Sequence, residues 1–372
     1  MKTRAAVLRA LNAPFCVETV ELDPPRRGEV LVRMVASGVC QSDLHFITGH
    51  RKTFLPAVRG HEGGGVVEAV GEGVTRLAPG DHVIQTFIAS CGHCAQCLRG
   101  RLTYCLTGFG GNGTMLDGTY RIHGAAGEDI ATGSRLAAFS EYSVVPENNL
   151  IAVPASVPLS TVCLLSCGVS TGMGAALNMA RIEPGDSVAV FGIGGVGLAA
   201  LQGAVIGGAG EVIAVDINPA KEAVARGFGA TRFIDGRADV LQEIRDASDG
   251  QGVDKVILTI DHVRAEHIAL GIEATAPCGV TVLVGAADDA LDYIPAYPTR
   301  MLRSQKTFTA TLAGGPNPPR DALRYLRLYQ AGRLRLDDFV TRTYSLDDIN
   351  VAVEDLRAGK NIRGVIVMDS SA

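Results

Sequence analysis

The chain has 372 residues, of which 47% are hydrophobic and 20% are charged. This length suits two domains, and the composition allows a large buried core, which excludes a disordered chain. The formal net charge of −5 provides no basic excess for nucleic-acid phosphates or anionic lipids, so neither is expected as a partner. Nine cysteines in so long a chain do not indicate a small disulfide-stapled fold, and their odd number leaves at least one thiol unpaired.

Neither a signal peptide nor a membrane span is expected. The apolar run behind the charged N-terminus covers only residues 5–8, which is too short for a signal-peptide core. Two uncharged stretches, 148–180 and 187–210, exceed the roughly 20 residues that cross a bilayer. Their prolines, serines and glycines are typical of a buried strand–turn–helix in a large α/β domain. We therefore expect a soluble, cytoplasmic protein.

The pattern of elements changes along the chain. The first 150 residues are rich in β-branched residues between turn signals, with strands expected at residues 3–9, 16–22, 30–36 and 65–70. From about residue 160, apolar strands alternate with helix-length segments, which indicates βαβ units on a parallel sheet. These strands are expected at 187–191, 211–215, 253–260 and 280–284, and the helices at 195–206, 219–228 and 262–275. Helices near 320–331 and 346–358 precede a last strand, 364–368, which is expected to return to the first domain.

Four cysteines lie close together in a loop of glycine and charged residues, at Cys91, Cys94, Cys97 and Cys105. Four thiolates at this spacing are typical of a closed, tetrahedral structural Zn²⁺ site. An iron–sulfur cluster is the main alternative, but no proline follows the fourth cysteine at the short ferredoxin spacing and no second cluster motif is present. Disulfides are the remaining alternative. We expect structural zinc.

Cys40, His61 and Cys167 form a second candidate metal set. Two thiolates and one imidazole leave one position open, which is the pattern of catalytic zinc. Each residue alone has an ordinary explanation, because a lone cysteine is usually a small buried side chain and a lone histidine is usually a surface or core residue. The neighbours favour the metal hypothesis, since Asp43 can accept a hydrogen bond from the second ring nitrogen of His61.

Ser42 and His45 would then form a proton relay. Ser42 places a hydroxyl next to the metal-bound oxygen, and His45 follows one helical turn later if the segment from residue 41 is helical. A metal of this kind lowers the pKa of a bound hydroxyl and polarises a carbonyl, and both directions of that chemistry need a hydride partner.

A glycine motif predicts a binding site for the hydride partner. The run Gly192, Gly194, Gly195, Val196, Gly197 follows a predicted strand and opens a predicted helix, and Asp216 comes 19 residues after it. In this context the motif predicts a dinucleotide-binding loop, with the pyrophosphate at the helix N-terminus. Asp216 is expected to bind the ribose hydroxyls, which favours NAD over NADP, and Lys221 is expected to reach the same ribose. A glycine-rich crossover without a ligand is the alternative.

Taken together, these motifs resemble the zinc-dependent medium-chain alcohol dehydrogenases, and the match covers essentially the whole chain. Supporting segments are residues 113–119, 170–174 and 359–363. The chain is similar to the long-loop branch, including bacterial nicotinoprotein or artificial-acceptor-dependent enzymes in which NAD remains tightly bound. The resemblance implies an α/β protein with a GroES-like β-barrel catalytic domain at 1–168 and 313–372. It also implies a Rossmann doubly wound NAD-binding domain at 169–312 and a homodimer or homotetramer.

The resemblance also assigns roles to individual residues. It implies two zinc ions per chain, one catalytic at Cys40, His61 and Cys167, and one structural at the four-cysteine loop. It implies that Glu62 is an acidic group near the metal, that Thr171 lies beside the nicotinamide and that Phe87 lines the substrate pocket. It implies that Arg363 binds the pyrophosphate. Gln41 departs from the family pattern, in which a cation often holds the pyrophosphate.

The expected reaction is interconversion of a primary alcohol, aromatic or medium-chain, with its aldehyde. The alternative is a thiol-dependent formaldehyde dehydrogenase acting on an S-hydroxymethyl thiol adduct. Such a bulky, charged substrate would need cations at the pocket rim, for which Arg51, Lys52 and Arg59 are candidates, although each is equally explained as solvated charge. The last three cysteines, Cys16, Cys163 and Cys278, are expected to be buried thiols without assigned chemistry.

Overall fold

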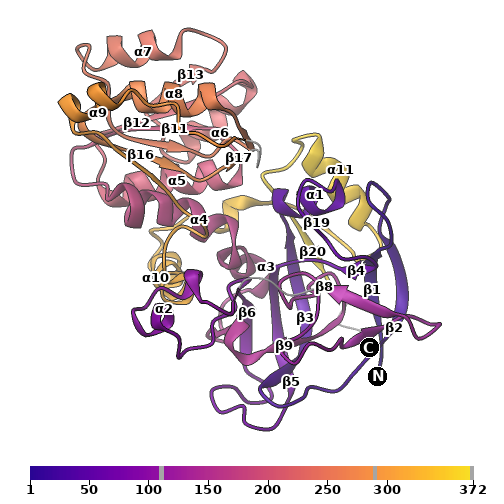
Figure 1. The fold of residues 1–372 in the computed structure, drawn as a ribbon. Helices are drawn as coiled ribbons and strands as arrows, with labels where there is room; N and C mark the ends of the chain where they lie inside the picture. Colours follow the sequence, from indigo (N-terminus) through magenta and orange to yellow (C-terminus); the bar gives the residue numbers. More distant parts are fainter. Residues whose placement is uncertain (109–112, 288–290, 369–372) are drawn as a thin grey trace. The chain divides into compact units, whose positions relative to one another are not determined.

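The computed structural model describes residues 1–108, 113–287 and 291–368. The chain divides into two compact units (Figure 1). Unit 1 comprises Met1–Cys167 and Pro316–Ala372, and unit 2 comprises Gly168–Gly315. Each unit is described by itself below.

Unit 1 is built around a small closed barrel and a larger sheet. The barrel order is β1-β2-β7-β8-β4, and the sheet order is β10-β6-β5-β3-β20-β19, with β9 also pairing with β3. The barrel strands are β1 (Lys2–Leu8), β2 (Cys16–Leu22), β4 (Ala57–Val58), β7 (Ile122–His123) and β8 (Asp129–Thr132). The sheet strands are β3 (Glu29–Val39), β5 (Glu62–Val70), β6 (His82–Gln85), β9 (Tyr142–Pro146), β10 (Leu150–Ala152), β19 (Val340–Tyr344) and β20 (Arg363–Val367).

Strand β3 is the centre of this sheet. It pairs antiparallel with β5, β9 and β20, so it joins the N-terminal part of the chain to the C-terminal segment, drawn in yellow in Figure 1. Its apolar residues Val30, Val32 and Met34 are buried in one core cluster with Ile366 from β20. The pairing of β3 with β20 places Val39 opposite Gly364, which brings the start of β20 next to Cys40.

Short helices cover the strands of unit 1. Helix α1 begins directly after Cys40, whose backbone N–H donates to the Asp43 carboxylate, and it buries Asp43, Leu44, His45 and Ile47. The helical segments of this unit are α1 (Gln41–Ile47), α2 (Ala95–Leu98), η1 (Leu102–Tyr104), η2 (Glu147–Asn149), α3 (Leu159–Val162), η3 (Cys163–Ser166), α10 (Pro318–Gln330), η6 (Asp337–Phe339) and α11 (Ile349–Arg357).

Unit 2 contains a parallel six-stranded sheet in the order β13-β12-β11-β14-β16-β18. This is the doubly wound order of a dinucleotide-binding fold, in which successive strands are added on one side of β11 and then, from β14 onward, on its other side. Strand β11 is almost entirely buried and carries the apolar sequence that such central strands require. The strands are β11 (Ser187–Phe191), β12 (Glu211–Asp216), β13 (Arg232–Asp235), β14 (Val253–Leu258), β16 (Thr275–Leu283) and β18 (Thr307–Ala310).

The remaining elements of unit 2 connect these strands. The helical segments are α4 (Gly168–Gly174), η4 (Ala175–Ala180), α5 (Gly195–Gly207), η5 (Pro219–Lys221), α6 (Glu222–Gly227), α7 (Val240–Ala247), α8 (Ala265–Ala274) and α9 (Pro298–Ser304). A separate two-stranded sheet pairs β15 (His262–Val263) with β17 (Ala286–Ala287).

Most expected elements are confirmed, and some boundaries are wrong. Strands 16–22 and 187–191 match β2 and β11 residue for residue. The helix expected from residue 262 begins only at Ala265, because His262 and Val263 pair with β17. Strand β16 begins at Thr275 rather than at residue 280, and it contains Cys278 at a positive φ of 63°, a conformation that local periodicity does not reveal.

The two uncharged stretches fold as several short elements. In the part of the chain that the structure describes, no single helix has the length and apolar composition needed to cross a membrane. One bent pair, Leu159–Ser166 with Gly168–Ala180, meets the criteria of length and composition together.

Candidate active site and metal centres

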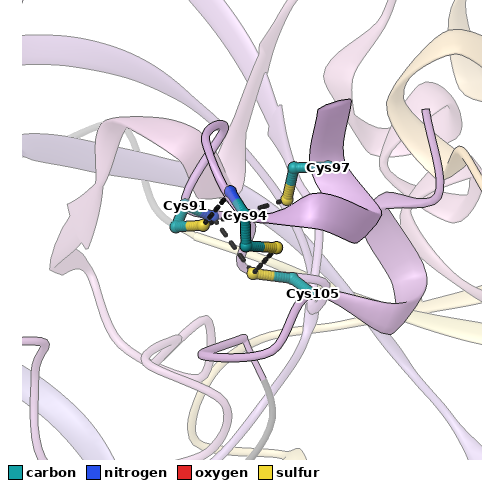
Figure 2. A group of neighbouring side chains, drawn as sticks. All are labelled: Cys91, Cys94, Cys97 and Cys105. Atoms are coloured by element: carbon teal, nitrogen blue, oxygen red, sulfur yellow. Dashed lines mark hydrogen bonds between the residues drawn. The ribbon is translucent and has the colours of Figure 1, made fainter. Parts of the chain in front are cut away.

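The four-cysteine loop forms a compact cluster of thiols. Cys94 precedes α2, Cys97 lies within it and Cys105 follows η1, so the two short helical segments turn the side chains toward one another (Figure 2). The Sγ atoms of Cys91 and Cys97 are 4.0 Å apart, as are those of Cys94 and Cys105. Four sulfurs at 2.3 Å from a tetrahedral Zn²⁺ would be separated by about 3.8 Å. The cluster therefore fits the predicted zinc site, and all four cysteines are free of disulfides.

The environment of these thiols differs from one to the next. Burial raises the pKa of Cys97 to about 12. Burial also acts on Cys105, but hydrogen bonds from the backbone N–H of Cys91 and from Thr107 lower its pKa to about 6. The backbone N–H of Cys94 donates to Cys91 Sγ at 3.3 Å. Backbone donors aimed at sulfur stabilise thiolates, which is the form that binds metal.

The second cluster contains Cys40, His61 and Cys167, as the sequence predicts, together with Glu62. One potential ligand atom from each of the four residues lies within 4.8 Å of all the others. Cys40 precedes α1, His61 precedes β5 and Cys167 follows η3, so three separate segments of unit 1 meet at this point. Two sulfurs and an imidazole are a donor set that suits zinc.

The imidazole of His61 is fixed by its neighbours. Its Nδ1 lies 3.1 Å from Asp43 Oδ1, and its Nε2 lies 3.1 Å from Ser42 Oγ. The hydrogen bond expected between Asp43 and His61 is thus present. It leaves Nε2 as the ligand atom and places the Ser42 hydroxyl beside it. Phe87 packs edge-on against the His61 ring with centroids 5.8 Å apart, which gives this side of the centre an apolar wall.

Glu62 is held by Arg363. The Arg363 guanidinium donates to Glu62 Oε2, and both side chains are almost completely buried. Arg363 was expected to hold a pyrophosphate, and the structure gives it this additional contact, which joins residues 301 positions apart in the chain. A carboxylate engaged by a buried cation is a poor permanent metal ligand. The ion pair with Arg363 therefore disfavours Glu62 as a fourth metal ligand beside Cys40, His61 and Cys167.

The titratable groups of this cluster influence one another. A hydrogen bond with Cys167 lowers the pKa of Cys40, and the same contact, together with burial, raises the pKa of Cys167. Burial acts to lower the pKa of Arg363, but attraction to Glu62 and to the two thiols raises it overall. Burial likewise opposes a charge on His61, whereas attraction to Asp43 raises its pKa. A divalent cation would replace the protons that these groups share.

Ser42 and His45 lie one helical turn apart on α1, as expected for a relay. His45 is buried, and its ring centroid lies 6.1 Å from that of His50. His50 Nδ1 in turn lies 2.8 Å from the Thr48 hydroxyl. Helix α1 and the residues directly after it therefore carry hydroxyl and imidazole side chains from Ser42 to the exposed residue His50.

The glycine loop of unit 2 follows β11 and opens α5. A Cβ at Gly197 would collide with the carbonyl of Gly192, so the loop closes only with glycine there. A Cβ at Gly194 would meet nothing within 4 Å, and no side chain caps the helix. The loop thus has an open face at Gly194, and no side chain among the described residues caps the first N–H groups of α5, which begins at Gly195 and Val196; this fits a dinucleotide pyrophosphate.

Asp216 ends β12 and is held in a fixed orientation. Its Oδ2 accepts from the backbone N–H of Ile193 at 2.7 Å and from Lys221 Nζ at 2.9 Å, and its Oδ1 accepts from Asn218 N at 2.9 Å. Lys221 therefore contacts Asp216, and both residues were expected to bind the same ribose. Thr171, which was expected beside the nicotinamide, is half-buried in α4.

The three candidate rim cations separate into two kinds. Arg51 and Lys52 are exposed, whereas Arg59 is only 6% exposed. The Arg59 guanidinium lies over the Phe46 ring at 3.7 Å from its centroid, and burial lowers its pKa to about 10. Sequence reasoning did not distinguish Arg59 from its neighbours. The available signal was its place in an apolar run, directly after Ala57 and Val58.

The last three cysteines do not all behave as expected. Cys163 is buried, but Cys16 and Cys278 are exposed, so the prediction of three buried thiols is wrong for two of them. Cys16 occupies an outward-facing position at the start of β2. Cys278 lies at the irregular point of β16 with positive φ.

Comparison with known proteins agrees with this geometry. Residues 26–155 match the family described as alcohol dehydrogenase GroES-like domain, and residues 195–328 match the family described as zinc-binding dehydrogenase. The chain is 40% identical over 368 residues to putative alcohol dehydrogenase D of Mycobacterium tuberculosis, covering 99% of this chain and 100% of that one. It is equally similar, at 40% over 368 residues and 99% of each chain, to the NDMA-dependent alcohol dehydrogenase of Amycolatopsis methanolica.

Solved structures show the same relationship. Benzyl alcohol dehydrogenase from Acinetobacter calcoaceticus is 32% identical with a TM-score of 0.92, covering 99% of this chain and 100% of that chain. The chain belongs to the zinc-binding alcohol dehydrogenase family, with a GroES-like and a Rossmann-type domain. It is an enzyme of alcohol oxidoreduction.

Proposed function

We propose that the chain is a zinc-dependent dehydrogenase that interconverts a primary alcohol and its aldehyde with NAD as hydride partner. The observation that carries this proposal is the meeting of Cys40, His61 and Cys167 beside the Ser42 hydroxyl, with Glu62 engaged by Arg363. Three ligands with an available fourth position are the arrangement of catalytic rather than structural zinc.

Bound zinc supplies a Lewis acid that lowers the pKa of an alcohol and polarises a carbonyl. Cys40, His61 and Cys167 would hold the ion, and the contact of Asp43 with Nδ1 would leave Nε2 of His61 as its ligand atom. Ser42 Oγ would accept the substrate hydroxyl proton as its own proton passes on toward His45, which lies one helical turn further along α1. Phe87 keeps one wall of the site apolar and favours an alcohol with an apolar carbon next to the reacting one.

The second zinc is proposed at the four-cysteine loop with a structural role, because all four ligands come from the protein and no position is open. NAD is proposed at the glycine loop. Asp216 supports NAD over NADP, because a 2′-phosphate would approach a carboxylate that is already fixed by three donors.

One experiment tests these points together. The protein, purified without added cofactor, is analysed for zinc and then mixed with benzyl alcohol while nicotinamide absorbance is followed. We expect two zinc ions per chain and the absorbance of reduced nicotinamide, either directly from retained cofactor or after addition of NAD. Reduced nicotinamide with NADP but not with NAD would overturn the cofactor assignment. Absence of turnover in a zinc-replete protein with every primary alcohol would overturn the proposed reaction.

A further inference from the structure

Arg59 is a buried cation whose hydrogen-bond donors are unused. No residue in the described part of the chain accepts a hydrogen bond from its guanidinium, and its Nε is fully buried without a partner. A buried charge without a hydrogen-bonded counterion is costly, and buried polar groups are otherwise almost always satisfied. The guanidinium therefore carries an N–H donor that no described residue satisfies.

An aromatic ring and a glycine backbone lie against the Arg59 guanidinium. The Phe46 ring covers one face. A Cβ at Gly133 would lie 2.7 Å from the Arg59 Cζ and Nη1 atoms, so the group fits there only because residue 133 has no side chain. Stacking of this kind fixes the plane of the guanidinium without using its N–H groups.

Asp43, which is negatively charged, does not accept a hydrogen bond from the Arg59 N–H groups. Asp43 attracts Arg59 electrostatically, but Asp43 Oδ1 already pairs with His61 Nδ1 and Oδ2 accepts from Cys40 N, each at 3.1 Å. The carboxylate of Asp43 is thus committed to the metal ligands. Among the described residues, no carboxylate is hydrogen-bonded to Arg59, so a bound ligand is the candidate source of such an acceptor.

The position of Arg59 relates its guanidinium to the reacting centre. Arg59 lies two residues before His61, and Phe46 lies four residues after Ser42 on α1. Side chains four apart share one face of a helix and are separated by about 6 Å along its axis. The ring that supports the guanidinium is therefore on the same face of α1 as the hydroxyl that lies beside His61 Nε2.

We propose that Arg59 binds a carboxylate carried by the substrate, so that the preferred substrate is an alcohol with an anionic carboxylate several bonds from its hydroxyl group. This inference rests on the proposed function, because it uses Ser42 and the open metal position to locate the hydroxyl. A guanidinium matches a carboxylate with two parallel N–H donors, which fixes the direction of the substrate as well as its charge.

The test compares two alcohols of the same shape, para-(hydroxymethyl)benzoate and para-methylbenzyl alcohol, at constant ionic strength. We expect kcat/KM to be about tenfold or more higher for the carboxylate, in line with the strength of a charge-assisted hydrogen bond. In Arg59→Met this ratio falls to about one or below, and Arg59→Lys retains part of it. Arg51→Met is the matched control, because it removes an exposed cation from the same segment and leaves the ratio unchanged.

Two results overturn the proposal. One is a wild-type ratio near or below one. The other is an Arg59→Met variant that loses activity on both alcohols equally, which would mean that Arg59 acts only through Asp43. If Arg59→Met does not fold, Gly133→Ala tests the same point, because the added methyl group displaces the guanidinium while keeping its charge. We expect the ratio to fall in that variant as well, and an unchanged ratio contradicts the proposal.

A binding measurement separates this inference from the proposed reaction. Saturation-transfer NMR with para-toluate reports carboxylate binding without turnover. Loss of binding in Arg59→Met supports the carboxylate site even if neither alcohol is oxidised, in which case only the proposed reaction fails. Equal binding to the wild type and to Arg59→Met overturns the carboxylate site even if both alcohols are oxidised.

Discussion

The two cysteine clusters of unit 1 are built from similar atoms and differ in what surrounds them. The four-cysteine loop draws all its ligands from 15 consecutive residues, Cys91 to Cys105, and surrounds them with backbone N–H donors. The cluster at Cys40 draws its ligands from three distant segments and places a hydroxyl, two carboxylates and two buried cations around them. Ligands from one short segment make a closed site that stabilises a loop. Ligands from distant segments make a site at which neighbouring side chains can influence the coordination position that no protein ligand occupies.

If this difference is correct, substitutions at the open cluster affect turnover and substitutions in the loop affect stability. The largest effect is expected for Cys40→Ala. Loss of a ligand removes the Lewis acid, and we expect kcat to fall by about 10³-fold or more. Zinc analysis of the variant should show that the ion of the four-cysteine loop is retained. A variant with normal turnover would refute the ligand assignment.

Ser42→Ala is expected to have the next largest effect. It removes the hydroxyl that lies 3.1 Å from His61 Nε2, and loss of a positioned proton acceptor costs about 10²-fold or more in kcat. Ser42→Thr keeps the hydroxyl and serves as the control. Both variants should keep the zinc content of the parent, and equal kcat values for the alanine and threonine variants would remove Ser42 from the relay.

Asp43→Asn should weaken metal binding more than it slows turnover at saturating zinc. The amide keeps the size of Asp43 but removes the negative charge that orients His61, and such outer partners are worth about 10- to 100-fold in metal affinity. Competition with a chelator measures this loss directly. Saturating zinc should restore most of the turnover, and an unchanged chelator titration would contradict the role given to Asp43.

Cys97→Ser should have the smallest effect on turnover. We expect loss of one zinc ion per chain and a decrease in Tm of about 10 °C, because zinc contributes several kcal/mol to holding such a loop. At a temperature where the variant remains folded, kcat should stay within about threefold of the parent. A loss of turnover as large as that of Cys40→Ala would show that the two clusters are not functionally separate.

The sequence predicts the local parts of this structure well. The spacing of the four cysteines, the glycine loop after residues 187–191 and the pairing of Asp43 with His61 all follow from residues near one another or from a repeated apolar pattern. The chemistry of each ligand type predicts two candidate metal clusters, and the structure brings the predicted side chains of each together.

The parts that sequence reasoning misses depend on long-range packing. No local pattern shows that Arg363 reaches Glu62 across 301 residues, since the contact is created by the pairing of β20 with β3. Burial of Arg59 depends on Phe46 in one segment and on the missing side chain of Gly133 in another. The exposed Cys278 and the strand at His262 are decided by the neighbouring strands rather than by their own sequences.

The return of the C-terminal segment has a consequence for biosynthesis. Glu62 leaves the ribosome long before Arg363 does, and at about 5–20 residues per second the interval is roughly 15–60 s. During that time the nascent chain contains the Glu62 carboxylate, which is buried in the folded protein, without Arg363. It also contains the edge of β3 without β20, its neighbouring strand. Unit 2 is complete in sequence at Gly315, whereas unit 1 can finish folding only after β20 has been synthesised.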